Sequence, residues 1–185
     1  ALRGRERVYL LIANSPRESV IGGTRSAVQA LVQQLGATFI PLHGVSTVHC
    51  RIAREVEQAY RELHLLKTTP PPGVRFYSGA WGRSYEPTRE SAAESIVAQA
   101  LTTIDFPALI ERAYDDGIRV FVEIGPGSSC SRMIAQTLGH RPHLARSACV
   151  AGQDAFGTIL RLLSCLIAER VPVDLSQLYD YEADD

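Results

Sequence analysis

Short apolar runs separated by turn residues make up the first fifty positions of the chain. Residues 7–13 form an apolar run that predicts a buried strand, and a second short strand is expected at 19–21. Apolar residues then recur at helical spacing over 28–35, and Gly36 marks the end of that helix. A further strand is expected near 38–45. The order strand, strand, helix, strand matches part of a ferredoxin-like split unit.

Helices alternate with short strands in the rest of the chain. The apolar spacing predicts one helix over 51–66, and the proline-rich run 69–73 forbids its continuation. A strand is expected at 74–78, followed by a polar loop, and further helices are expected at 91–101 and 107–116. This alternation predicts an α/β class with a partly parallel sheet.

The clearest local pattern is the β-rich run 119–124, which enters a glycine turn at 125–129 and then a helix that carries Met133, Ile134 and Leu138. Such a turn before a helix can cradle a phosphate. The complete glycine-rich or P-loop pattern is absent, however, which favours a turn that simply needs glycine backbone angles. A last apolar helix is expected at 155–168.

Composition narrows the possible partners. The chain has 185 residues, of which 45% are hydrophobic and 21% charged, as in a globular protein. Nineteen basic and 20 acidic residues give a net charge of -1, so neither nucleic acid nor an anionic membrane is an expected partner. No run approaches the roughly 18 apolar residues of a membrane span, and no signal-peptide layout is present. We expect a cytoplasmic protein.

Candidate chemistry is sparse. No zinc or redox site is expected, because the four cysteines form no CxxC pair. His49 lies at an expected strand-to-helix junction, where an imidazole can act as a base or serve as a structural hydrogen-bonding residue. No Gly-x-Ser-x-Gly nucleophile elbow occurs. Asp105 and Glu123 lie near element ends, where solvated or capping roles are the ordinary expectation.

Several ordered segments resemble the acyltransferase domains of fatty-acid and polyketide synthases, over nearly the whole chain. Residues 11–23 look like the family's "AxxNSPxxxVxSG" hairpin, and 45–50 look like the segment that carries its catalytic histidine. Residues 103–106 resemble the family's "PVxF" segment, 120–127 its "FxExGPG" strand and turn, and 166–179 the end of such a domain. The chain is thus similar to the C-terminal half of the malonyl-CoA:acyl carrier protein acyltransferase domain of a type I polyketide or polyunsaturated fatty acid synthase.

The resemblance implies a fold and a division of the chain. Residues 1–48 would form a partial ferredoxin-like small subdomain. Residues 49–185 would form the C-terminal part of an α/β-hydrolase-like acyltransferase core and its tail.

The resemblance also implies a function, in which a serine takes malonyl from coenzyme A as an ester and passes it to the phosphopantetheine thiol of an acyl carrier protein. The serine belongs to the family's N-terminal half, so this chain would supply the histidine alone. Neighbouring synthase domains, such as a ketosynthase, are expected partners, and neither a bound cofactor nor a metal is expected. The alternative is a non-catalytic platform or carrier-protein docking domain.

Residue roles carry over by position. His49 would be the general base, and Asn14 would line the acyl pocket. Ser46, Thr47 and Val48 match the specificity segment but neither of its known patterns, so the acyl group stays open. Asp105 occupies the position whose backbone carbonyl is expected to orient the histidine ring.

Overall fold

The structure is a computed structural model that describes residues 6–179, and the chain divides into two compact units, 1–117 and 118–185. The boundary that was expected after residue 48 falls inside the first unit. The reason is that strands from both sides of that boundary pair in one sheet.

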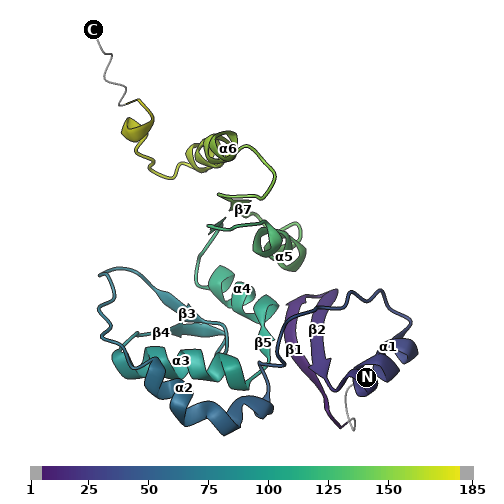
Figure 1. The fold of residues 1–185 in the computed structure, drawn as a ribbon. Coiled ribbons are helices and arrows are strands. Elements are labelled where there is room, and N and C mark those ends of the chain that lie inside the picture. The colour runs from purple at the N-terminus through teal and green to yellow at the C-terminus, as the bar shows by residue number, and fades with distance from the viewer. Residues whose placement is uncertain (1–5, 180–185) are drawn as a thin grey trace. The chain divides into compact units, whose positions relative to one another are not determined.

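The first unit contains a three-stranded sheet in the order β2-β1-β5 (Figure 1). β1 (Val8–Ser15) pairs antiparallel with β2 (Glu18–Gly23), as the two apolar runs predict. On its other edge β1 pairs parallel with the short strand β5 (Ile104–Asp105). β1 buries Val8 and Leu11, so the central strand carries part of the core.

α1 (Arg25–Leu35) follows the hairpin and packs against β2. Its buried residue is Leu31, which is 1% exposed. The helix ends at Gly36 in the left-handed conformation with φ 58°, which glycine adopts without steric cost. The C-terminal end of this helix agrees with the sequence pattern.

The prediction of a strand near 38–45 is wrong, because no helix or strand forms over 37–48. Pro41 has no N–H to donate to a ladder, and Gly44 turns the chain with φ 72°. Ile40 is accordingly 76% exposed. The ferredoxin-like part therefore keeps its hairpin and helix but not this strand.

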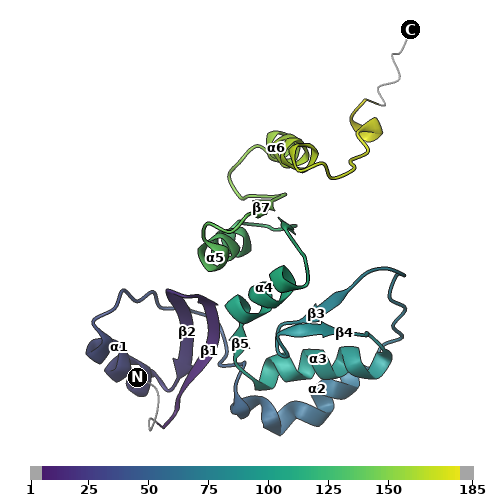
Figure 2. The ribbon, with the colours of Figure 1, turned by 180° about the vertical axis from the view of Figure 1, so that it is seen from behind.

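Two helical segments lie along α3 (Arg89–Leu101), the longest helix of the first unit; the pairing of α2 and α3 is visible from both sides (Figures 1 and 2). The single helix expected over 51–66 is instead a 3-10 helix, η1 (Arg51–Val56), followed by α2 (Glu57–Leu63). Val56 leaves the helical region with φ -110°, which separates the two segments.

A hairpin and one further helix complete the first unit. β3 (Phe76–Ser78) pairs antiparallel with β4 (Arg83–Tyr85), which lies in the stretch expected to be loop. α4 (Phe106–Asp115) packs on β1. The Tyr77 hydroxyl donates to Asp116 Oδ2 at 2.8 Å and so joins the hairpin to the end of α4.

The second unit is a strand–helix–strand arrangement with a helix after it. β6 (Val120–Glu123) and β7 (Leu144–Ser147) pair in parallel, and α5 (Ser129–Leu138) connects them and packs on both. α6 (Ala155–Ala168) packs against β7, and a 3-10 turn, η2 (Ser176–Leu178), follows. The expected mixed α/β class with partly parallel strands is confirmed. Within residues 6–179, no helix is long and apolar enough to cross a bilayer.

Candidate active site

His49 lies at the start of η1, and its ring is held against the last turn of α3. Its Nδ1 lies 2.5 Å from the backbone carbonyl oxygen of Gln99. A carbonyl oxygen only accepts hydrogen bonds, so Nδ1 carries the proton and donates it. In the neutral ring, Nε2 then keeps a free lone pair, which is the tautomer that a general base requires.

The backbone around His49 is anchored as well. His49 has φ 61°, a left-handed conformation that is uncommon for a residue other than glycine. The next residue, Cys50, is buried and donates its N–H to the Ala100 carbonyl at 3.2 Å. Two consecutive residues are thus tied to two consecutive carbonyls of α3, which holds the imidazole in one place.

The last turn of α3 is chemically suited to hold an imidazole. The final carbonyls of a helix have no partner within it, so Gln99 and Ala100 are free to accept bonds from His49 and Cys50. These carbonyls lie at the negative end of the helix dipole. The end of α3 therefore supplies the acceptors that position the imidazole and the backbone beside it.

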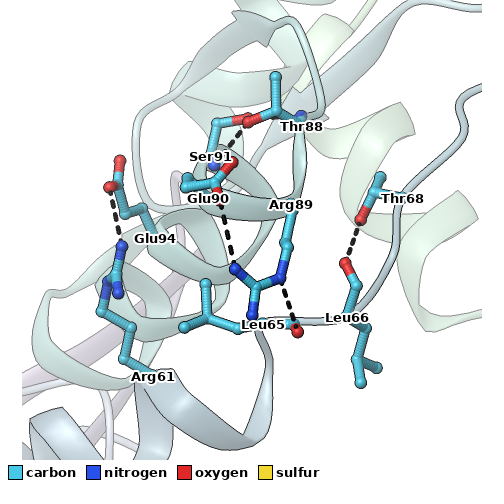
Figure 3. A network of polar contacts seen from close by, with 9 residues as sticks. All are labelled: Arg61, Leu65, Leu66, Thr68, Thr88, Arg89, Glu90, Ser91 and Glu94. Carbon is cyan, nitrogen blue, oxygen red and sulfur yellow. Dashed lines mark hydrogen bonds and ion pairs between the residues drawn. The ribbon is translucent and has the colours of Figure 1, made fainter.

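Polar contacts near the start of α3 cap the helix and join it to α2 (Figure 3). Thr88 and Ser91 form a capping box, with the Ser91 N–H donating to Thr88 Oγ1 at 3.1 Å. The Arg89 Nε donates to the Leu65 carbonyl at 3.1 Å. Arg61 of α2 lies 3.5 Å from Glu94 of α3. Two of these contacts, Arg89 with Leu65 and Arg61 with Glu94, join α3 to α2 and to the segment that follows α2.

A cavity of about 250 Å³ opens beside His49, between α3 and the segment formed by η1 and α2. Most of its walls are aliphatic, and Glu57 is the one carboxylate among its lining residues. The lining comprises Val48, His49, Ala53, Val56, Glu57, Tyr60, Ile96, Val97, Gln99, Ala100 and Leu101. An apolar wall limits water around the ring and strengthens its hydrogen bond to Gln99.

The other expected site residues are only partly brought together. Val48 lines the cavity beside His49, whereas Thr47 lines a second hollow next to the β1–β2 hairpin, and Ser46 is exposed. Asn14 uses its amide to donate to Glu18 Oε1 at 2.9 Å, across the turn of the hairpin. No contact between Asn14 and His49 is present among the described residues.

The backbone carbonyl that was expected from Asp105 comes from another residue. The carbonyl that bonds the His49 ring belongs to Gln99. Asp105 instead starts α4, where its Oδ1 accepts the Ala108 N–H at 3.0 Å. This is an ordinary N-cap, which stabilises a helix by about 1 kcal/mol.

The glycine turn after β6 is not an open phosphate cradle. The Glu123 carboxylate already occupies the start of α5, accepting the Ser131 N–H at 2.7 Å, the Ser131 hydroxyl at 2.8 Å and the Cys130 N–H at 3.2 Å. Burial raises the pKa of Glu123, but these hydrogen bonds outweigh it and the net pKa lies below its ordinary value. Burial and the neighbouring Glu123 raise the pKa of Cys130, which disfavours a nucleophilic thiolate there.

Gln99 and Ala100 are the site residues that sequence reasoning missed. They act through backbone carbonyls, which every residue type possesses, so side-chain patterns carry no signal for them. Only their place at the end of an expected helix, 91–101, was visible in the sequence. Within residues 6–179, no group of three or more His, Cys, Asp or Glu side chains could hold a metal ion.

Comparison with known proteins identifies a family for the chain. Residues 1–157 match the family described as "Acyl transferase domain". The chain is 28% identical over 177 residues to a polyunsaturated fatty acid synthase protein of Thraustochytrium sp., covering 89% of the chain and 9% of that protein.

Solved structures show the same fold. The acyltransferase domain from the second module of the salinomycin polyketide synthase matches with a TM-score of 0.80 and 22% identity, over 95% of this chain and 42% of that one. The malonyl CoA-acyl carrier protein transacylase from Clostridium perfringens matches with a TM-score of 0.71 and 20% identity, over 89% and 50%. The chain thus spans about half or less of each of these proteins. From the family match over most of its length, we conclude that the chain belongs to the acyl transferase domain family.

Proposed function

We propose that this chain supplies the catalytic histidine of a malonyl-type acyltransferase, which loads an extender acyl group from coenzyme A onto an acyl carrier protein. The observation that carries the proposal is the bond from His49 Nδ1 to the Gln99 carbonyl, which leaves Nε2 free to accept a proton. The nucleophilic serine would come from the half of the domain that this chain does not span.

In the first half-reaction, His49 Nε2 takes the proton of the serine hydroxyl while the serine oxygen attacks the thioester carbonyl. The tetrahedral intermediate collapses with cleavage of the carbon–sulfur bond. The coenzyme A thiolate leaves and takes the proton back from the imidazolium. The products are a serine ester and free coenzyme A.

The second half-reaction runs the same steps with a new thiol. His49 takes the proton of the carrier protein's phosphopantetheine thiol, whose sulfur attacks the serine ester. The serine oxygen leaves and receives the proton, so His49 ends neutral after each half-reaction. The hydrogen bond to the Gln99 carbonyl holds the ring in the same orientation in both half-reactions.

Expected partners follow from the chemistry and from the named relatives. A transacylase of this kind needs a coenzyme A thioester as donor and a carrier protein as acceptor, and one solved relative is named a malonyl CoA-acyl carrier protein transacylase. The synthase relatives support neighbouring domains such as a ketosynthase. No bound cofactor enters either half-reaction.

The test is transfer of radiolabelled malonyl from malonyl-CoA to the full-length protein. We expect His49→Ala to reduce labelling at least about 100-fold, in line with loss of a general base. The matched control is His143→Ala, because the His143 Nδ1 also faces a backbone carbonyl, that of Arg141 at 2.7 Å, in the second unit. Gln99→Ala should keep nearly full activity, since it retains the carbonyl.

Three outcomes would contradict the proposal. Full labelling of His49→Ala would remove His49 as base, and equal losses in His49→Ala and His143→Ala would indicate a structural effect. An absence of labelling in the unaltered full-length protein would favour the platform function.

A further inference from the structure

A second hollow, of about 390 Å³, lies in the first unit at the open end of the β1–β2 hairpin. Its volume is within the range of about 300–1,000 Å³ usual for small-molecule sites. Its lining residues include no carboxylate; they are Arg7, Tyr9, Gly23, Thr24, Thr47 and Ile52. We call it the Arg7 hollow.

The Arg7 hollow adjoins the segment that leads to His49. Thr47 lies two residues before His49, and Ile52 belongs to η1. The contact with the hairpin is close, because a Cβ at Gly22 would lie 3.3 Å from Thr47 Cγ2. A ligand in the hollow would therefore lie beside the proposed catalytic histidine without touching its ring.

One arginine, Arg7, lines the Arg7 hollow, and a second, Arg51, lies next to its lining residue Tyr9. The Arg7 guanidinium forms no ion pair or hydrogen bond with any described residue. The Arg51 guanidinium carbon lies 5.8 Å from the centroid of the Tyr9 ring, which holds this second cation over a wall of the hollow. The Thr24 hydroxyl makes no capping bond to α1 and can donate to a ligand.

This chemistry selects a ligand class. Guanidinium groups bind phosphate through paired, charge-assisted hydrogen bonds, and hydroxyls add neutral donors. Resting on the proposed function, we propose that the Arg7 hollow binds the phosphate group of the phosphopantetheine arm, which coenzyme A and a carrier protein have in common. The phosphate lies at the opposite end of the arm from the reacting sulfur, so its site is expected outside the contacts of the His49 ring, as the lining of the Arg7 hollow is.

The test compares two donors in the full-length protein, malonyl-CoA and malonyl-pantetheine, which lacks the phosphate. We expect Arg7→Gln and Arg51→Gln each to raise the KM for malonyl-CoA about tenfold, the effect of one charge-assisted hydrogen bond of about 1.4 kcal/mol, with kcat unchanged. Malonyl-pantetheine should show no change. Arg54→Gln is the control, because Arg54 is an exposed η1 residue outside the lining.

The outcomes distinguish the two possible sources of the phosphate, coenzyme A and the carrier protein. A parallel rise in KM for the holo carrier protein assigns the hollow to the shared arm, whereas a rise for coenzyme A alone assigns it to that donor. Unchanged KM values in both variants, or equal rises for malonyl-pantetheine, would overturn the site.

Calorimetric binding of coenzyme A separates this site from the proposed function, because it needs no turnover. If the unaltered protein transfers no acyl group but Arg7→Gln binds coenzyme A more weakly, the proposed transferase function is refuted while the phosphate site in the Arg7 hollow stands. Normal transfer with unchanged binding by both variants would refute the site alone.

Discussion

Gly23 offers the sharpest test of the backbone geometry beside the Arg7 hollow. It ends β2 with φ 152°, and a Cβ built there would lie 2.0 Å from the Arg7 carbonyl oxygen. The same oxygen accepts the Thr24 N–H at 3.1 Å. Gly23→Ala therefore cannot be accommodated unless the Arg7 carbonyl moves, which breaks this bond and the pairing of Gly23 with Val8.

The magnitude follows from a matched glycine. Gly36 also has a positive φ, 58°, but a Cβ there would meet nothing within 4 Å. We expect Gly36→Ala to cost roughly 1–2 kcal/mol of unfolding free energy from its left-handed backbone alone. Gly23→Ala adds one lost hydrogen bond, from the Thr24 N–H to the Arg7 carbonyl, at about 1 kcal/mol, so it should cost about 1 kcal/mol more.

Urea unfolding of both variants, with linear extrapolation to water, measures this difference. The measurement is repeated at several protein concentrations so that association does not enter the comparison. Equal losses in Gly23→Ala and Gly36→Ala would show that the Arg7 carbonyl is free to move, and the reasoning would fail.

Two further predictions concern stability. In the folded chain the pKa of Glu123 lies below its ordinary value, so the ionised carboxylate stabilises the fold above about pH 4.5. This stabilisation is lost as the pH falls through the folded pKa. The free energy of unfolding of Glu123→Gln should therefore depend less on acid pH than that of the unaltered chain. Tyr77→Phe removes the donor to Asp116, which is 15% exposed, and should cost about 1 kcal/mol in urea unfolding, whereas Tyr85→Phe, whose hydroxyl bonds no described residue, should cost less.

Local patterns predicted much of the fold because they act within one element. The apolar spacing over 155–168 matches α6 at both ends. The β-rich run before the glycine turn corresponds to β6, and the helix expected after the turn corresponds to α5. Gly36 ends α1 as expected. Strands of only two to four residues, β4, β5 and β7, lacked enough periodicity to be recognised.

Non-local packing explains the failures. The run 38–45 is apolar enough for a strand, but a strand needs a partner, and Pro41 and Gly44 interrupt the segment. The pairing of β1 with β5 joins segments about ninety residues apart, on opposite sides of the division expected after residue 48. No local pattern encodes such a pairing.

The sequence by itself determined that His49 lies in a segment similar to the acyltransferase family's histidine motif and that a helix ends near residue 101. Only the tertiary structure decided that the Gln99 carbonyl, fifty residues away, bonds the imidazole, while Asp105 caps α4. The physical reason is that the sequence specifies each side chain, whereas every residue has the same backbone carbonyl, so the sequence pattern does not distinguish one carbonyl from another. Which carbonyl faces the ring depends on how α3 packs against η1 and α2.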